Sequence, residues 1–418
     1  MFQNIVRKLQ VSLISNDEDH LEASERMIDS IAHIVGIRNT FGDKNKKKFT
    51  VASIITTIAF CGTFVYVGPF SQGIFFFQVL SDKIRRFQAM NCFSSTIVPL
   101  SKYIFMHSSS FRLSVIMEMS RQGMLSLPEG STAHATMRRV LRKASFVSWM
   151  VILNQAFIHV FYMILPFVMT IFGSERYLPT TPGDIYGISS KYQSPNYEIT
   201  FTLTCVAAMF SAFNQTVYIV LFVTLLSHEL GHFYAICDTF NDIHKILHDK
   251  KHTKEQNNDH IDSYVSENDK HKKVEELIRF CLKHHQYLFR YHDKICDLYK
   301  GIFGVHFLIM IIVLVTTLQT LNSWGIMNTI LTGVTGIMPL MVYCFGGEML
   351  INAGTDMSFA IYSCGWEEMK IKHARMIQLM LCLSQHPLCY TAVGIFVMNH
   401  DTFGNVAQVI YKIYAVFN

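Results

Sequence analysis

A histidine and glutamate pattern in the middle of the chain could bind zinc. The residues from His228 to His232 read H-E-L-G-H, which fits the general pattern H-E-x-x-H. In a helix, His228 and His232 share one face and can ligate one metal ion, while Glu229 can act as a general base. The pattern therefore raises metal-assisted peptide hydrolysis as one kind of chemistry for this chain.

The pattern lies at the end of an apolar helix, as it does in the site-2 class of intramembrane metalloproteases, which it resembles. Those enzymes take a third ligand from an Asp that precedes a Gly in a distant membrane segment, and this chain contains no Asp-Gly dipeptide. We therefore favour a polar helix end that enters the cytosol. We expect no catalytic residue, metal ligand or cofactor, and we keep a protease that uses His228, Glu229 and His232 as an alternative.

A second triplet, Glu175, Arg176 and Tyr177, is similar to the E-R-Y signature of G-protein-coupled receptors. That signature is cytoplasmic, whereas the basic flanks described below place this triplet outside the cell. The chain also lacks an Asn-Pro dipeptide, so the N-P-x-x-Y motif is absent, and no Cys begins the third apolar span. A G-protein-coupled receptor is therefore a second, less favoured alternative.

Polar residues interrupt the last apolar segment, which runs from Leu388 toward the C-terminus. Its ionisable residues include Asp401 and Lys412, and such a residue within a membrane helix costs about 2.5–3.5 kcal/mol on insertion scales unless it faces water or protein. A helix with one apolar and one polar face is suited to line a pore. The alternative is a helix that turns its polar face toward a partner subunit.

Aromatic, methionine and hydroxyl residues gather in the outer halves of the second to fifth spans. Such residues could enclose a small, mostly apolar ligand, although they also suit ordinary helix packing. The candidate pocket residues are Cys92, Phe93, Thr96, Phe157, His159, Tyr162, Met209, Phe210, Phe213, Val313, Thr316, Thr317 and Thr320.

The elements that must position these residues are membrane helices. Half of the 418 residues are apolar and only 16% are charged, against about a quarter in a soluble domain, which disfavours disorder and nucleic-acid binding. Because a spanning helix needs about 20 mostly apolar residues, we predict spans at 50–72, 87–107, 145–173, 199–227, 301–322, 327–351 and 388–417. The second span contains Lys102, whose ammonium could extend to the membrane surface.

The distribution of Lys and Arg predicts how these spans are oriented, because short cytoplasmic flanks are enriched in both residues. Four lysines between Lys44 and Lys48 directly precede the first span, and six basic residues between Arg112 and Lys143 separate the second span from the third. Arg85 and Arg86, on the opposite side, count against this orientation. With an odd number of spans, the N-terminus is predicted to be cytoplasmic and the C-terminus extracellular.

The region 228–300 carries 25 of the 67 charged residues of the chain. From Glu275 onward its apolar residues recur at helical spacing, which predicts helices that project into the cytosol. The stretch 249–272, rich in Lys, Asn, Asp and His, is predicted to be disordered.

Aromatic, glycine and proline residues recur at defined positions from residue 343 to the C-terminus. They are Tyr343, Cys344, Phe345, Gly346, Ser358, Ala360, Tyr362, Trp366, Gln385, Pro387, Gly394, Phe396, Phe403, Tyr411, Tyr414 and Phe417. In order and spacing this series resembles the insect odorant receptors, and the remainder of the chain matches them in layout.

The resemblance implies an all-α, polytopic membrane protein with seven transmembrane helices. It also implies the odorant-binding subunit of a ligand-gated, non-selective cation channel in the plasma membrane of a sensory dendrite. Such a subunit binds a small volatile compound, contacts membrane lipid and forms a tetramer with a shared co-receptor. The co-receptor itself has a much longer loop between the fourth and fifth spans, so this chain is expected to be the ligand-specific subunit.

The same resemblance assigns roles along the chain. Asp401, Gln408 and Lys412 would face the conduction path and Val416 would form a hydrophobic gate, although a lysine beside a cation pore departs from the family pattern. The implied segments are 1–49 (cytoplasmic), 50–227 (spans one to four with the pocket), 228–300 (cytoplasmic anchor), 301–351 (spans five and six), 352–387 (anchor helix) and 388–418 (pore-lining helix).

Overall fold

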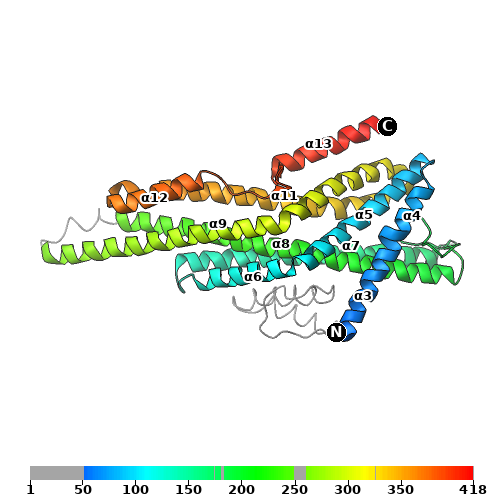
Figure 1. The fold of residues 1–418 in the computed structure, drawn as a ribbon, viewed down its shortest axis with the longest axis horizontal. Helices are drawn as coiled ribbons and strands as arrows, with labels where there is room; N and C mark the ends of the chain where they lie inside the picture. Colours follow the sequence, from blue (N-terminus) through cyan, green and yellow to red (C-terminus); the bar gives the residue numbers. More distant parts are fainter. Residues whose placement is uncertain (1–50, 174, 180–182, 249–259, 325, 418) are drawn as a thin grey trace.

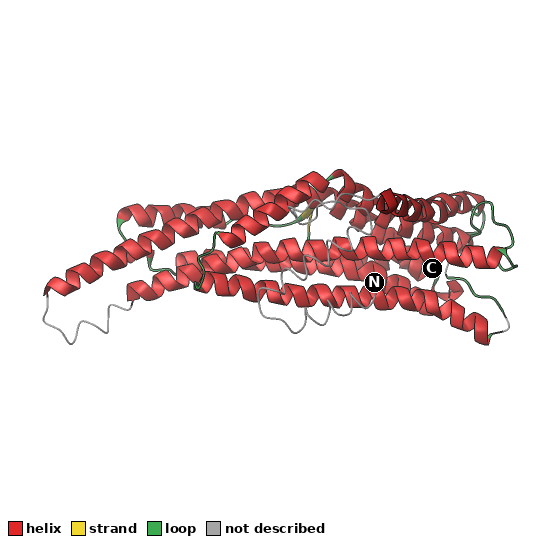
Figure 2. Cartoon of the chain, turned by 90° about the horizontal axis from the view of Figure 1, so that it is seen from below, coloured by secondary structure: helices red, strands yellow, loops and turns green. Residues whose placement is uncertain are grey.

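The structure is a computed structural model that describes residues 51–173, 175–179, 183–248, 260–324 and 326–417. This part of the chain is helical apart from short connections and one small β-hairpin. Figures 1 and 2 show an elongated bundle in which the longest helices run side by side. The predicted all-α membrane fold is confirmed, while the expectation for residues 1–49 lies outside the described residues.

The helices and strands have the following bounds. They are α3 (Val51–Val65), the π-helix η1 (Tyr66–Phe70), α4 (Ser71–Gln78), α5 (Lys83–Ser108), α6 (Ser110–Leu125), α7 (Thr132–Phe172), α8 (Asn196–His248), α9 (His260–Gln319), α10 (Leu321–Trp324), α11 (Ile326–Tyr362), the 3₁₀ helix η3 (Trp366–Glu368), α12 (Ile371–Ser384), β1 (Thr391–Ala392), β2 (Phe396–Val397) and α13 (His400–Phe417).

The helices α8 and α9 are much longer than a membrane is thick. They contain 53 and 60 residues, which at 1.5 Å per residue correspond to roughly 80 and 90 Å, against a hydrocarbon core of about 30 Å. Both helices therefore continue beyond the membrane. The predicted disorder of 249–272 is wrong for 260–272, which belong to α9, whereas 249–259 lie outside the described residues.

Within the described residues, five helical segments are long and apolar enough to cross a membrane: Thr57–Gln78, Thr132–Phe172, Asn196–His248, Lys270–Gln319 and Thr329–Glu368. The predicted second and seventh spans correspond to α5 and α13. The buried polar side chains of α5 include Asn91 and Lys102. Asn91 donates to Thr316 Oγ1 and Thr317 Oγ1 of α9 at 2.9 and 2.8 Å. Buried hydrogen bonds of this kind allow a less apolar helix to remain within the bundle.

Lys102 does not extend to the membrane surface, so that expectation is wrong. The side chain is fully buried, and Nζ donates to Oε1 of Gln215 on α8 at 3.0 Å. Nζ also lies 5.1 Å from the ring centroid of Tyr218 and 5.7 Å from that of Tyr343. An acceptor and two aromatic faces inside the bundle thus hold the ammonium.

The last helix begins at His400, so the continuous helix expected from Leu388 is wrong for its first twelve residues. In their place, β1 pairs antiparallel with β2, and the turn between them holds Val393 and Gly394 at φ values of 55° and 75°. A right-handed helix cannot include such residues. The side chain of Asn399 then accepts a hydrogen bond from Thr402 N at 2.9 Å and caps α13.

The first span contains a π-helical turn, η1, which connects α3 to α4. Pro69 lies within η1, and a proline in a helix lacks the N–H that would bond one turn back. A wider π-turn accommodates this loss without ending the helix. Within η1, Gly68 lies so close to α5 that a Cβ at this position would be 2.9 Å from Thr96 Cγ2.

Candidate ligand pocket and pore helix

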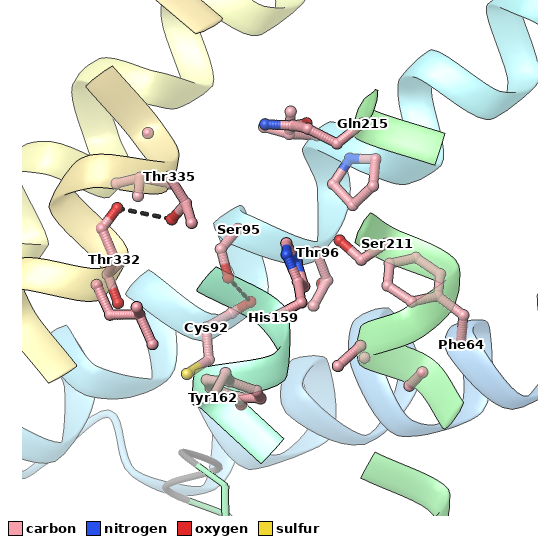
Figure 3. A pocket seen from close by; sticks show the side chains of 18 of the residues that line it. Phe64, Cys92, Ser95, Thr96, His159, Tyr162, Ser211, Gln215, Thr332 and Thr335 are labelled. Atoms are coloured by element: carbon pink, nitrogen blue, oxygen red, sulfur yellow. Dashed lines mark hydrogen bonds between the residues drawn. The ribbon is translucent and has the colours of Figure 1, made fainter. Parts of the chain in front are cut away.

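A cavity of about 220 Å³ lies within the bundle, between α3, η1, α4, α5, α7, α8, α9 and α11. Figure 3 shows side chains from several of these helices around it. Of the thirteen residues proposed from the sequence, five line the cavity: Cys92, Thr96, His159, Tyr162 and Val313. These five residues therefore remain candidates for contact with a ligand.

Five of the other predicted residues are aromatic or Met side chains that lie away from the cavity. Phe157 and Met209 point outward and are 70% and 39% exposed. The other three are held by apolar packing. Phe93 stacks on Phe76, the ring of Phe210 is tilted against that of Phe64, and Phe213 packs against the same apolar cluster as Phe210.

The three threonines predicted on α9 lie behind the cavity wall. Thr316 and Thr317 accept hydrogen bonds from the amide of Asn91, which itself lines the cavity. The hydroxyl of Thr320 donates to the carbonyl of Thr316 at 2.9 Å. These hydroxyls therefore fix Asn91 and the helix backbone and do not line the cavity.

Sequence reasoning missed lining residues in the first and sixth spans and several amides. The cavity wall includes Gln72, Gln155 and Gln215, and also Thr332 and Thr335 of α11. A usable signal existed, because a polar side chain in an apolar span usually faces the bundle interior. Applied to every span, this rule would have selected the three glutamines.

The pocket has no charged lining residue. Among the described residues that line it, none is Asp, Glu, Lys or Arg, while amides, hydroxyls and one imidazole are interspersed with Phe, Val, Ile and Met side chains. Burial of an ion without a partner of opposite charge is costly. The arrangement therefore suits a small neutral molecule with a few polar groups.

The loop between α7 and α8 packs against the first span beside the pocket. Ile185 is buried against Phe64 and Val67, and Tyr186 N donates to Ser71 Oγ at 3.2 Å. Burial lowers the pKa of the Lys191 ammonium in this loop, and the Asp184 carboxylate, 3.7 Å away, opposes part of the shift. The packed loop helps to enclose this side of the bundle.

The residues of the H-E-x-x-H pattern are buried in the interior of the helix bundle. The Nδ1 atom of His292 lies 2.7 Å from Oε1 of Glu229, and the hydroxyl of Tyr390 donates to Oε2 of the same carboxylate. Glu229 is therefore engaged by protein groups and is not free to act as a general base. Within the described residues no group of three His, Cys, Asp or Glu side chains is placed to hold a metal ion.

The helix α13 has one packed and one exposed face. Val406 and Ile410 are buried against the bundle, whereas Asp401, Gln408, Lys412 and Val416 are exposed. The spacings of seven, four and four residues place these four side chains on one face of a helix with 3.6 residues per turn. The four residues predicted to face a pore thus form a single stripe on the side away from the bundle.

Residues 84–411 match the family described as 7tm odorant receptor. The chain belongs to this family. It is 33% identical to Odorant receptor 10a of Drosophila melanogaster over 87 residues, which cover 21% of each chain, and 23% identical to Odorant receptor 43b of the same species over 143 residues, which cover 32% of this chain and 35% of that receptor. The matched stretches thus span only about a fifth to a third of these relatives.

Solved structures show the same fold over nearly the whole length of this odorant receptor. The insect olfactory receptor OR5 from Machilis hrabei in complex with eugenol aligns with 96% of this chain and 99% of its own, at a TM-score of 0.77 and 14% identity. A second structure of the same receptor gives a TM-score of 0.72. The expected fold of a seven-span odorant receptor is therefore confirmed.

Membership of this family bears on the enzyme alternative raised by the sequence. This odorant receptor is a multi-pass membrane protein of a family of receptors, not of enzymes, so the protease interpretation has no support. The E-R-Y triplet lies in the loop after α7, where Arg176 donates to the carbonyl of Tyr192 at 3.2 Å. The Arg176 side chain therefore has a local structural role.

Proposed function

We propose that this odorant receptor is the odorant-binding subunit of a ligand-gated, non-selective cation channel in the plasma membrane. In this proposal it forms a tetramer with an odorant receptor co-receptor and opens when a small volatile compound occupies the pocket. The observation that carries the proposal is the connection from the neutral pocket, through α9 and α11, to the amphipathic helix α13.

The connection is formed by direct contacts. Val313 of α9 and Thr335 of α11 line the pocket, and both helices pack against α13. At the far end of α9, Nε2 of Gln319 donates to the carbonyl of Tyr414 on α13 at 3.2 Å. A displacement of α9 by a bound ligand would therefore reach α13 through a hydrogen bond and through apolar packing.

The mechanism requires the ligand to prefer the open state. A ligand shifts an equilibrium only by its difference in affinity for the two states. A 100-fold preference supplies about 2.7 kcal/mol, enough to shift an equilibrium by two orders of magnitude. In the proposed mechanism, movement of α9 and α11 against α13 widens the constriction near Val416.

The exposed stripe of α13 supports its proposed role as the pore lining. Asp401, Gln408 and Lys412 would otherwise face lipid, where an ionisable group is costly, whereas a water-filled path shared with other subunits would solvate them. Val416, which is 81% exposed, would provide the hydrophobic constriction. The packed region formed by α12 with α9 and α11 is the proposed anchor that joins the subunits.

The experiment is co-expression with a co-receptor and recording of current in response to a panel of neutral volatile compounds. We expect a non-selective cation current that persists when G-protein signalling is blocked. A response that requires G-protein coupling would contradict the channel. An epitope at the C-terminus should be labelled on intact cells, and labelling only after permeabilisation would contradict the proposed orientation.

A further inference from the structure

Several hydroxyl groups on the pocket wall already donate their protons in hydrogen bonds to the protein backbone. Ser95 Oγ and Thr96 Oγ1 of α5 each donate to a backbone carbonyl one turn earlier at 2.8 Å, and Thr335 Oγ1 of α11 does so at 2.9 Å. A hydroxyl has one proton and two acceptor lone pairs. Toward the pocket, these three groups can therefore only accept a hydrogen bond.

His159 of α7 also donates its ring proton to the backbone. Its Nδ1 lies 2.8 Å from the carbonyl oxygen of Gln155, and because a carbonyl can only accept, Nδ1 must carry the proton. No acidic side chain is found among the described residues of the pocket wall to stabilise an imidazolium. In the neutral ring the remaining nitrogen, Nε2, is then an acceptor.

The amide of Gln155 also leaves an acceptor without a partner. Its Nε2 donates to the sulfur of Met338 at 3.8 Å, while its Oε1 is buried and has no hydrogen-bond partner within the described part of the chain. A buried polar atom without a partner is destabilising. The walls contributed by α5, α7 and α11 thus present unfilled acceptors.

The wall contributed by α8 also offers hydrogen-bond donors. The hydroxyl of Ser211 lines the pocket and makes no hydrogen bond to any residue that the structure describes, so it can donate. Gln215 uses its Oε1 to accept from Lys102, which leaves its Nε2 as a donor. A ligand hydroxyl can donate to one side and accept from the other, whereas an ether, ester or ketone oxygen can only accept.

We propose that the pocket selects small neutral alcohols or phenols, and that Nε2 of His159 is the principal acceptor of the ligand hydroxyl. This inference rests on the proposed function and specifies the ligand class of the same pocket. The volume of about 220 Å³ equals that of roughly seven water molecules in the liquid, which favours a compact ligand. A carboxylate or an ammonium has no charged partner on the wall.

The test compares alcohols with their methyl ethers, which add one methyl group on the oxygen and therefore cannot donate a hydrogen bond. Benzyl alcohol with benzyl methyl ether, and hexanol with methyl hexyl ether, are applied to cells that express the receptor and a co-receptor. We expect the EC50 of each alcohol to be about fivefold to tenfold lower than that of its ether, the range expected for one buried hydrogen bond.

Two variants test whether acceptors on the pocket wall cause this preference for alcohols over ethers. His159→Phe keeps an aromatic ring but removes both nitrogens, and it should bring the ether-to-alcohol EC50 ratio close to one. Thr96→Val removes a different acceptor with little change in shape and should lower the ratio by a smaller factor. Val160→Ala is the control, because Val160 neighbours His159 on α7 but is 53% exposed on the outer face, and it should leave the ratio unchanged.

The outcomes separate this inference from the proposed function. Ethers that match or exceed their alcohols, or a ratio that is unchanged in both His159→Phe and Thr96→Val, would overturn the hydroxyl preference. So would currents evoked by other neutral volatiles but by neither alcohol, and in these cases the channel would stand. A receptor labelled at the cell surface that responds to no volatile compound would overturn the proposed function itself.

Discussion

The imidazole of His292 and the carboxylate of Glu229 are hydrogen-bonded at 2.7 Å inside the bundle, where both side chains are buried. The contact joins α9 to α8, and Tyr390, which directly precedes β1, bonds the other carboxylate oxygen. One carboxylate thus connects two long helices to the segment that leads into α13.

The first prediction concerns this carboxylate. Glu229→Ala should destabilise the protein by about 3–5 kcal/mol, because it removes one partner of a buried pair, and Tyr390→Phe by about 1–3 kcal/mol, because it leaves one oxygen short of a donor. Thermal unfolding of the purified receptor would measure both. Asp297→Asn is the control: its pair with Lys300 is 58% exposed on both sides and should contribute at most about 1 kcal/mol. Equal effects in all three variants would contradict the argument.

The second prediction concerns Lys102 and Gln215. Gln215→Leu should be strongly destabilising, by about 3 kcal/mol, because it removes the amide acceptor of a buried ammonium. Within the described residues Lys102 forms no ion pair that could compensate. The double variant Lys102→Met/Gln215→Leu removes both partners and should recover most of the loss, as thermal unfolding would show. A double variant less stable than Gln215→Leu would show that the ammonium has another role.

The third prediction concerns the close approach of the first span to α5. Gly68→Ala places a Cβ about 2.9 Å from Thr96 Cγ2, and such overpacking costs about 1–3 kcal/mol. We expect EC50 values to rise by at least about fivefold, with the largest rise for the bulkiest ligands. Gly62→Ala is matched to it, because a Cβ at Gly62 meets nothing within 4 Å, and its dose-response curves should equal those of the wild type. A similar shift in both variants would argue against a specific contact.

The fourth prediction concerns Lys412 on the exposed stripe of α13. If this stripe lines the pore, Lys412→Gln should raise single-channel cation conductance by up to about fivefold, because a like charge close to the ion path repels by about 1 kcal/mol in water. Asp401→Asn should lower the conductance for the converse reason. Lys372→Gln in α12, where the side chain is 70% exposed, tests for a general effect of surface charge. Unchanged conductance in the Lys412 and Asp401 variants would place the pore elsewhere.

The local spacing of residues alone was sufficient to predict the exposed stripe on α13. Asp401, Gln408, Lys412 and Val416 share a face because they are spaced at close to whole helical turns, and Val406 and Ile410 fall opposite them. Membrane helices are also recognised from the chain itself, since about 20 apolar residues suffice to span the hydrocarbon core. These properties depend on neighbours in the sequence, so the sequence by itself determined them.

The tertiary structure decided which residues meet across the bundle. His159 lines the pocket and Phe157, two residues earlier on α7, faces outward, because the rotation of α7 is set by the helices packed against it. The positive φ values of Val393 and Gly394 end an apolar run that composition alone would continue as helix. Glu229 gains its partners from residues 63 and 161 positions away. Such contacts depend on long-range packing, which no local spacing of residues specifies.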